Sequence, residues 1–192
     1  MEPQLMTVNW TRKEIMVAGF VNGIVMGAFG GSMSKRESGQ WDDWIVVNDD
    51  VMGGLSQSRP EVTSSGTLIF SGNLSLENNG GFASIRHTAR PFELDRALGI
   101  RLRVKGDGKK YQLRVRTSDR FDGIAYKADF ETKKGVWIEF RFRWNVFTAT
   151  FRGRTIADAP ALKPLNIRQI GFLIADKQEG AFELEIQTLE AF

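Results

Sequence analysis

The chain has 192 residues, which fits one domain with a short additional segment, and its 42% of hydrophobic residues are enough to bury a core. It contains no cysteine, which excludes disulfides, thiolate chemistry and cysteine-based zinc sites. The formal net charge of +3 conceals a segregation, because residues 101–154 hold 15 Lys and Arg against 6 Asp and Glu. Such a basic region can steer an acidic partner, but a solvated sheet face is the simpler interpretation.

Near the N-terminus, residues 15–31 form an uncharged run of 17 residues, close to the shortest length that spans a bilayer. Within this run, small residues recur every fourth position and would form one stripe on a helix, at Gly19, Gly23, Gly27 and Gly31. We therefore predict an N-terminal segment over residues 1–31 with an apolar, helical stretch at 15–31, followed by a linker at 32–40.

Three interpretations of the apolar stretch remain open: a membrane anchor or a helix docked in a membrane complex, a secretory signal, and a segment packed on the domain. We favour membrane association or targeting, because its glycines would weaken a helix in water. The expected location is therefore a membrane, either the bacterial inner membrane or an organelle membrane. A secreted or periplasmic protein, released by signal cleavage, is the alternative.

From residue 41 onward, apolar and polar residues alternate with a period of two, which is typical of β-strands. Strands are predicted over residues 66–76 (two strands, with a break at Gly72-Asn73), 80–88, 100–105, 111–116, 126–130, 138–144, 149–152, 169–175 and 182–187. The strand at 169–175 is almost continuously apolar, which suits burial on both faces. Many short strands separated by turns predict an all-β fold over residues 41–192, an antiparallel β-sandwich or barrel.

Two of these strands flank the turn signal Gly106-Asp107-Gly108 and are predicted to form a hairpin with one apolar and one basic face. The strand at 138–144 alternates in the same way. If these strands are neighbours, their polar phase forms one basic surface from Arg101, Arg103, Arg114, Arg116, Arg141 and Arg143. Nucleic acid is not the favoured partner, because the aromatic residues fall in the apolar phase and single strands need exposed aromatics.

Two blocks, DDVMGGLS at residues 49–56 and NGGFASIR at 79–86, occur in this order with further landmarks at 70–74, 102–108, 151–154, 170–172 and 180–186. Through them, residues 41–192 resemble the complex I intermediate-associated protein 30 (CIA30) family. The resemblance implies a galactose-binding-like jelly roll and a non-catalytic role in assembling respiratory complex I, by holding membrane-arm intermediates. The implied partner is a protein client, a subunit or intermediate of a membrane respiratory or photosynthetic complex.

The stretch at residues 41–58 mixes tryptophans, acids, glycines and serines in a way that no strand or helix requires. With the second block it supplies the candidate partner- or ligand-binding residues Asp49, Asp50, Gly53, Gly54, Ser56, Ser58, Asn79 and Arg86. A structured turn, in which Asx side chains cap backbone amides, is the alternative that we favour for the loop. Arg86 is a candidate to pair with Asp49 or Asp50. No metal site is predicted, because too few oxygen ligands can be named for a hard cation.

Catalysis has little support in the sequence. His87 is the only histidine, and no nucleophile elbow or phosphate-binding glycine motif accompanies it, so we predict neither an enzyme nor a cofactor. The alternative to a scaffold is a carbohydrate or small-ligand binding module. Its sugar-stacking platform would be built from Trp41, Trp44, Trp137 and Trp144, although core packing is the favoured role of these rings.

Overall fold

The structure is a computed structural model, and it describes residues 41–88, 94 and 96–192. The apolar stretch at 15–31 and the linker at 32–40 lie outside the described residues. Within the described part of the chain, no helix has the length and apolar character needed to cross a membrane. The helical elements there are four short 3-10 turns, η1 (Asp49–Met52), η2 (Glu77–Asn79), η3 (Trp144–Val146) and η4 (Pro164–Asn166).

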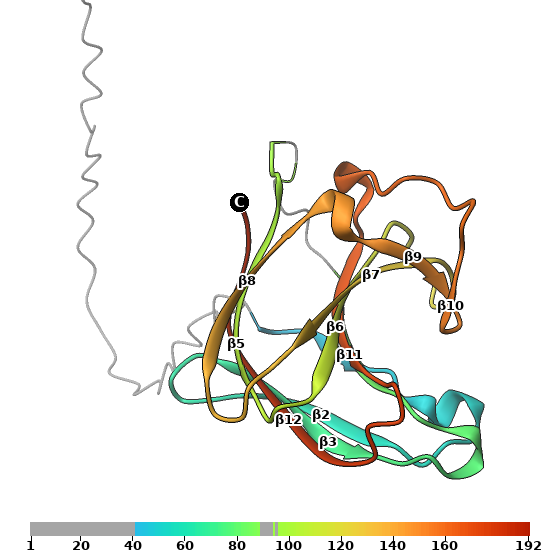
Figure 1. Cartoon of the computed structure of the whole chain (residues 1–192), viewed down its shortest axis with the longest axis vertical. Coiled ribbons are helices and arrows are strands. Elements are labelled where there is room, and N and C mark those ends of the chain that lie inside the picture. The colour runs from blue at the N-terminus through green and yellow to red at the C-terminus, as the bar shows by residue number, and fades with distance from the viewer. Residues whose placement is uncertain (1–40, 89–93, 95) are drawn as a thin grey trace, which may run out of the picture. The chain divides into compact units, whose positions relative to one another are not determined.

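Two β-sheets face each other and enclose the core, so the predicted all-β antiparallel sandwich is confirmed (Figure 1). The seven-stranded sheet contains, in spatial order, β1 (Trp44–Val46), β4 (Ala83–Thr88), β11 (Gln169–Ile174), β6 (Lys110–Arg116), β7 (Ala125–Glu131), β9 (Thr148–Phe151) and β10 (Arg154–Thr155). The five-stranded sheet contains β2 (Gln57–Val62), β3 (Leu68–Leu74), β12 (Gly180–Ala191), β5 (Gly99–Gly106) and β8 (Trp137–Arg143). All ladders between these strands are antiparallel.

In the inner strands of both sheets, such as β3, β5, β6 and β12, the apolar phase is buried between the sheets, as the alternation predicts. Phe70 of β3 and Phe182 of β12 meet edge to face with their ring centroids 5.0 Å apart, and both are buried. In the seven-stranded sheet, Trp44 of the edge strand β1 stacks on Phe172 of β11 with the ring centroids 5.6 Å apart. All six residues of β11 are buried, which confirms the expectation that this strand is covered on both faces.

The predicted hairpin of residues 100–105 and 111–116 is wrong. β5 pairs with β12 and β8, whereas β6 pairs with β11 and β7, so the chain crosses from one sheet to the other at Gly106-Asp107-Gly108. The physical reason is that both strands bury their apolar phase in the same core. The alternation is therefore the same whether the strands pair with each other or face each other across the sandwich.

The predicted break at Gly72-Asn73 is also wrong, because β3 continues through both residues. A Cβ atom at Gly72 would lie 2.0 Å from the carbonyl oxygen of Gln57 on β2, so glycine here permits close approach of two backbones. The sequence pattern missed β2, which contains Pro60 and lies at the edge of its sheet. Proline is tolerated there because an edge strand has one unpaired side.

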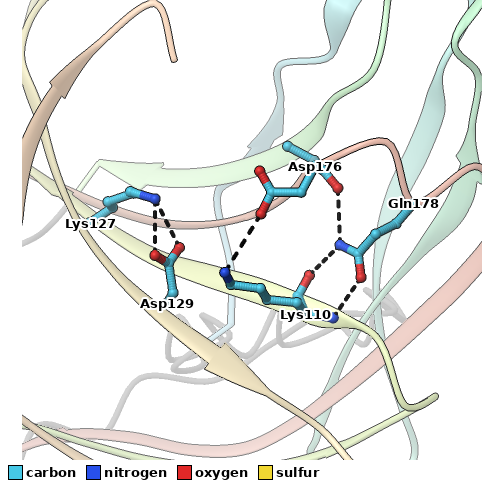
Figure 2. A network of polar contacts seen from close by, with 6 residues as sticks. Lys110, Lys127, Asp129, Asp176 and Gln178 are labelled. Carbon is cyan, nitrogen blue, oxygen red and sulfur yellow. Dashed lines mark hydrogen bonds and ion pairs between the residues drawn. The ribbon is translucent and has the colours of Figure 1, made fainter. Parts of the chain in front are cut away.

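β12 is the middle strand of the five-stranded sheet. The β2–β3 pair lies on one side of it and the β5–β8 pair on the other. The bend before β12 is fastened to the seven-stranded sheet by the side-chain amide of Gln178. Its Oε1 accepts the Lys110 N–H at 2.8 Å, and its Nε2 donates to the carbonyls of Lys110 at 2.7 Å and Ala175 at 2.9 Å (Figure 2). Gln178 thus supplies to the start of β6 the bonds that a neighbouring strand would give.

Candidate functional site

The two sequence blocks meet at the carboxylate of Asp49. This side chain is fully buried at the start of η1 and accepts hydrogen bonds from both blocks. From its own loop, the Ser56 N–H donates to Oδ1 at 2.9 Å and the Ser56 hydroxyl donates to Oδ2 at 2.5 Å. From the second block, the N–H groups of Gly81 and Phe82 donate to Oδ2 at 2.6 Å and 3.2 Å. The carboxylate therefore joins two segments that are separated by about thirty residues of chain.

The electrostatics of Asp49 follow from these bonds. Burial alone would raise the pKa of the Asp49 carboxyl, because desolvation disfavours its charged form. The hydrogen bonds from Ser56, Gly81 and Phe82 stabilise the anion and outweigh that effect, so the pKa lies below its ordinary value. Asp49 is thus an anion whose accepting oxygens are engaged by protein donors.

Two glycines of the blocks leave room for this carboxylate. A Cβ atom at Gly54 would lie 2.4 Å from Cγ of Asp49, and one at Gly80 would lie 2.6 Å from Oδ2. Gly53 has a different reason to be glycine: its φ of 88° is in the left-handed region that ends η1, and nothing lies within 4 Å of its Cβ position. Of the four glycines in the two blocks, Gly53 turns the chain, Gly54 and Gly80 leave room for the carboxylate, and Gly81 donates its N–H to it from a backbone with φ of 126°.

A second polar link runs beside the first. Oδ1 of Asn48 accepts the Ser58 hydroxyl at 2.7 Å and the Ser84 N–H at 3.2 Å, and the Ser84 hydroxyl donates to the Val47 carbonyl. The sequence does not single out Asn48, because an asparagine beside two aspartates carries no distinguishing signal. Together Asn48 and Asp49 hold the loop as a structured turn, the arrangement favoured for it.

Three aliphatic side chains of the η1 loop are exposed. Val51, Met52 and Leu55 expose 55%, 61% and 51% of their surfaces, although their loop is anchored by a buried carboxylate. Asp50 and Asn79 are also exposed. The loop thus combines a rigid polar base with exposed aliphatic side chains.

The sequence made Arg86 a candidate to pair with Asp49 or Asp50, but in the structure it pairs with neither. It lies on β4, where its Nη1 donates to the Phe121 carbonyl at 2.9 Å and its guanidinium lies 5.4 Å from the centre of the Phe121 ring. Asp49 has no need of a cation, because backbone and hydroxyl donors already satisfy its oxygens.

The condition for one basic surface is not met, because the six arginines are divided between the two sheets. Arg101, Arg103, Arg141 and Arg143 lie on β5 and β8 of the five-stranded sheet, and Arg114 and Arg116 lie on β6 of the other. On the five-stranded sheet, glutamates offset much of the charge through the pairs Arg101–Glu190, Lys105–Glu185 and Arg141–Glu139. That face is a mixed-charge ladder, and Arg114 and Arg116 belong to a different surface.

The four tryptophans do not gather into one platform. Three of them belong to or pack against the hydrophobic core: Trp41, Trp44 and Trp144. The indole N–H of Trp41 donates to the Gly66 carbonyl at 2.9 Å, and that of Trp144 donates to the Ala97 carbonyl at 2.7 Å. Trp137 lies on β8, where Arg103 and Lys105 cover its ring. Core packing, the favoured role of these rings, accounts for three of the four.

His87 lies on β4 with its ring 5.5 Å from that of Trp44. No cluster of three or more His, Asp or Glu side chains suited to a metal ion occurs within residues 41–88, 94 and 96–192.

Comparison with solved structures gives the same architecture. A family 11 carbohydrate-binding module of a cellulosomal cellulase of Clostridium thermocellum superposes with a TM-score of 0.59 at 15% identity, covering 78% of this chain and 88% of that one. The same module type in complex with a mixed-linked tetrasaccharide gives a TM-score of 0.55 at 14% identity, covering 84% and 92%. At this identity the likeness concerns the fold, and it confirms the predicted galactose-binding-like jelly roll.

Two curated relatives are each called "Complex I intermediate-associated protein 30, mitochondrial". The one from Neurospora crassa is 26% identical over 171 residues, covering 78% of this chain and 62% of the relative. The one from Mus musculus is 26% identical over 177 residues, covering 82% and 54%. The chain therefore spans a little more than half the length of these relatives.

The family comparison covers most of the sandwich. The family described as "Complex I intermediate-associated protein 30 (CIA30)" matches residues 33–186, a range that includes both blocks joined by Asp49. On that match, the chain belongs to the CIA30 family.

Proposed function

We propose that this protein is a non-catalytic assembly factor of respiratory complex I, which binds a membrane-protein intermediate of that complex. The observation that carries the proposal is the family match over residues 33–186, together with two relatives whose names associate them with complex I intermediates. We extend this proposal to the location of the protein in the cell. The protein would work at the membrane that houses complex I, with residues 15–31 contributing to membrane association.

The η1 loop is the best-suited contact for such a client. An assembly factor must present a surface that an incomplete complex can bind and later release. Val51, Met52 and Leu55 offer aliphatic area for such contact, and the bonds of Asp49 fix the loop before the client arrives, which lowers the entropy cost of binding. Asp50 lies beside them as an exposed acid. Exposed aliphatic side chains on a structured loop are typical of protein interaction sites.

A pull-down from detergent-solubilised membranes of the source organism tests this proposal. The tagged full-length protein is expected to recover subunits of complex I, identified by mass spectrometry. Replacing Met52 with Asp should reduce that recovery strongly, because the charge would be desolvated in an apolar contact. Recovery of no complex I subunit by the wild type would contradict the proposed function.

A matched variant distinguishes the effect of changing the η1 loop from the effect of a general loss of surface hydrophobicity. Leu165 of η4 is 62% exposed, close to the value for Met52. Leu165→Asp should therefore leave recovery unchanged while Met52→Asp lowers it. Equal recovery with both variants would show that the client binds elsewhere on the protein. Saturable quenching of tryptophan fluorescence by oligosaccharides would instead favour the carbohydrate-binding alternative.

A further inference from the structure

Three arginines gather on the outer face of the seven-stranded sheet. Gly171 of β11 pairs with Arg86 of β4 on one side and with Arg114 of β6 on the other. Two residues earlier on β11, Gln169 pairs with Arg116. Since directly paired residues on neighbouring strands share a face, Arg86 and Arg114 flank a position that carries no side chain. The missing side chain leaves a shallow pocket over the backbone of Gly171.

The residues that line this pocket include three arginines. Besides the backbone around Gly171, the side chains at its wall include Ser84, Arg86, Arg114, Arg116, Gln169 and Leu173. Glycine is required at its floor, because a Cβ at Gly171 would lie 2.5 Å from the Ile85 carbonyl oxygen.

Neutral acceptors orient all three guanidinium groups. The bonds are Arg86 Nη1 to Phe121 O at 2.9 Å, Arg114 Nη2 to Thr150 Oγ1 at 2.9 Å, and Arg116 Nη1 to Gly123 O at 2.8 Å. Carbonyl and hydroxyl oxygens fix the direction of a guanidinium without neutralising its charge. The cluster is therefore held in place while its three positive charges persist.

The acids nearest to the cluster have other partners. Asp122 pairs with Arg152 at 2.8 Å, and Asp129 pairs with Lys127 at 2.9 Å (Figure 2). None of the ion pairs within the described residues includes Arg86, Arg114 or Arg116. This contrasts with the five-stranded sheet, where glutamates lie opposite the arginines.

The unfavourable electrostatics of the three clustered arginines lower the pKa values of Arg86 and Arg114. Burial, followed by the charges of Arg116 and Arg114, lowers the pKa of Arg86 to about 10, although Asp122 acts in the opposite direction. Burial and the charge of Arg116 lower the pKa of Arg114 to about 10 as well, against the effect of Asp129. Like charges held together in a partly buried position destabilise the fold unless an anion compensates them.

One donor of the cluster is also unsatisfied. Nε of Arg114 is buried and has no hydrogen-bond partner. A buried donor without an acceptor is uncommon in folded proteins and costs free energy. An oxyanion in the pocket would supply acceptors as well as charge.

We propose that Arg86, Arg114 and Arg116 form a binding site for a phosphate group, carried by a small phosphomonoester or by a phospholipid headgroup. Guanidinium groups match the geometry of phosphate oxygens and bind them with paired hydrogen bonds. A phosphomonoester with a charge near −2 balances three cations better than a single carboxylate does. This inference stands apart from the proposed function and can hold or fail without it.

Binding of inorganic phosphate to the full 192-residue chain in detergent tests the site. We would titrate phosphate at constant ionic strength, with chloride as the replaced anion, and follow binding by calorimetry. The wild type is expected to bind phosphate saturably, with chloride ineffective. Replacing Arg114 or Arg86 with Gln should weaken binding by about 10- to 100-fold, since each removes charge-assisted hydrogen bonds.

Arg143→Gln is the matched control, because it removes the same charge from the exposed face of the other sheet and should leave the affinity unchanged. Circular dichroism would verify that each variant is folded. If both cluster variants failed to fold, saturation of the wild type alone would still test the site. Affinities that are equal in the wild type and in a folded Arg114→Gln variant would overturn the proposal.

Vesicle flotation distinguishes the two sources of the phosphate group. Phosphatidic acid exposes a phosphomonoester, and phosphatidylglycerol provides an anionic phosphodiester control in the same phosphatidylcholine background. If the headgroup is the source, flotation should be greater with phosphatidic acid and the excess should disappear in Arg114→Gln. If free phosphate saturates the wild type and no such excess is seen, the source is a soluble phosphomonoester. Absence of both effects overturns the proposal.

Discussion

Oδ2 of Asp49 accepts the backbone N–H of Gly81 at 2.6 Å, across 32 positions of sequence. This contact joins the two blocks that characterise the chain, and it makes a buried carboxylate the link between the η1 loop and the entry to β4. A link of this kind has measurable consequences for stability, for pH dependence and for the glycines around it.

Asp49→Asn is expected to destabilise the protein by about 2–4 kcal/mol. The amide keeps one acceptor oxygen, but its NH₂ group faces donors from Ser56, Gly81 or Phe82, which leaves buried donors unpaired. Chemical denaturation in urea measures the change. The neighbouring Asp50→Asn alters an exposed side chain and should stay within about 0.5 kcal/mol of the wild type. Similar losses in both variants would show that Asp49 is not the link.

The contribution of Asp49 should depend on pH in a defined direction. Its pKa in the folded protein is lowered relative to the unfolded chain, so the folded state binds its proton less readily. The stabilisation is therefore present above the unfolded pKa of about 3.9 and is lost as the pH falls through the folded pKa. The difference in unfolding free energy between wild type and Asp49→Asn should shrink below about pH 4. A difference that grew on acidification would contradict this sign.

Gly54 and Gly53 should differ in how they couple to Asp49. In Gly54→Ala the new methyl group would collide with the Asp49 side chain, and Asp49→Ala removes the two closest contacts, to Cγ at 2.4 Å and Oδ1 at 2.5 Å, while the contact to Cβ at 2.8 Å remains. A double-mutant cycle should therefore give a coupling energy of about 0.5–3 kcal/mol for the pair 49 and 54. The cost of Gly53→Ala comes from its positive φ, so its cycle with Asp49→Ala should be additive within about 0.5 kcal/mol.

Gln178→Ala should cost about 1–3 kcal/mol, because the N–H and carbonyl of Lys110 lose their partner at the start of β6. Hydrogen exchange at the Lys110 amide should accelerate as well, which a general loss of packing would not single out. Glu179→Gln changes the adjacent, exposed side chain and should be close to neutral. If hydrogen exchange at the Lys110 backbone amide were unchanged in Gln178→Ala, the Gln178 side chain, drawn in Figure 2, would not be what holds the start of β6.

The strands were predictable because their alternation is a property of single segments. Residues 169–175 showed an unbroken apolar run, and β11 is buried throughout. The partners of each strand were not predictable in the same way. β5 and β6 have the same alternation and face one core, so no local signal says that they belong to different sheets.

For the candidate site too, the local features could be predicted from the sequence and the contacts between distant segments could not. The composition of residues 49–56 indicated a structured turn, because aspartate and glycine have local roles in turns. The backbone donors that complete this turn, at Gly81 and Phe82, come from a distant segment that the composition does not indicate. Because these donors already satisfy the Asp49 carboxylate, the expected pairing of Arg86 with Asp49 or Asp50 was wrong, and Arg86 bonds to the Phe121 carbonyl instead. The arginine cluster emerged only with the register that aligns Gly171 with Arg86 and Arg114.

The central position of β12 also bears on how the protein is made. On a ribosome, the β2–β3 and β5–β8 pairs emerge first, and each presents an unpaired edge and an apolar face until β12 follows. Such edges invite pairing with other chains, so nascent protein that has not yet reached residue 180 is vulnerable to aggregation and to proteases. Completion of the five-stranded sheet is thus a late event in biogenesis, and a helper that covers nascent chains would act before that point.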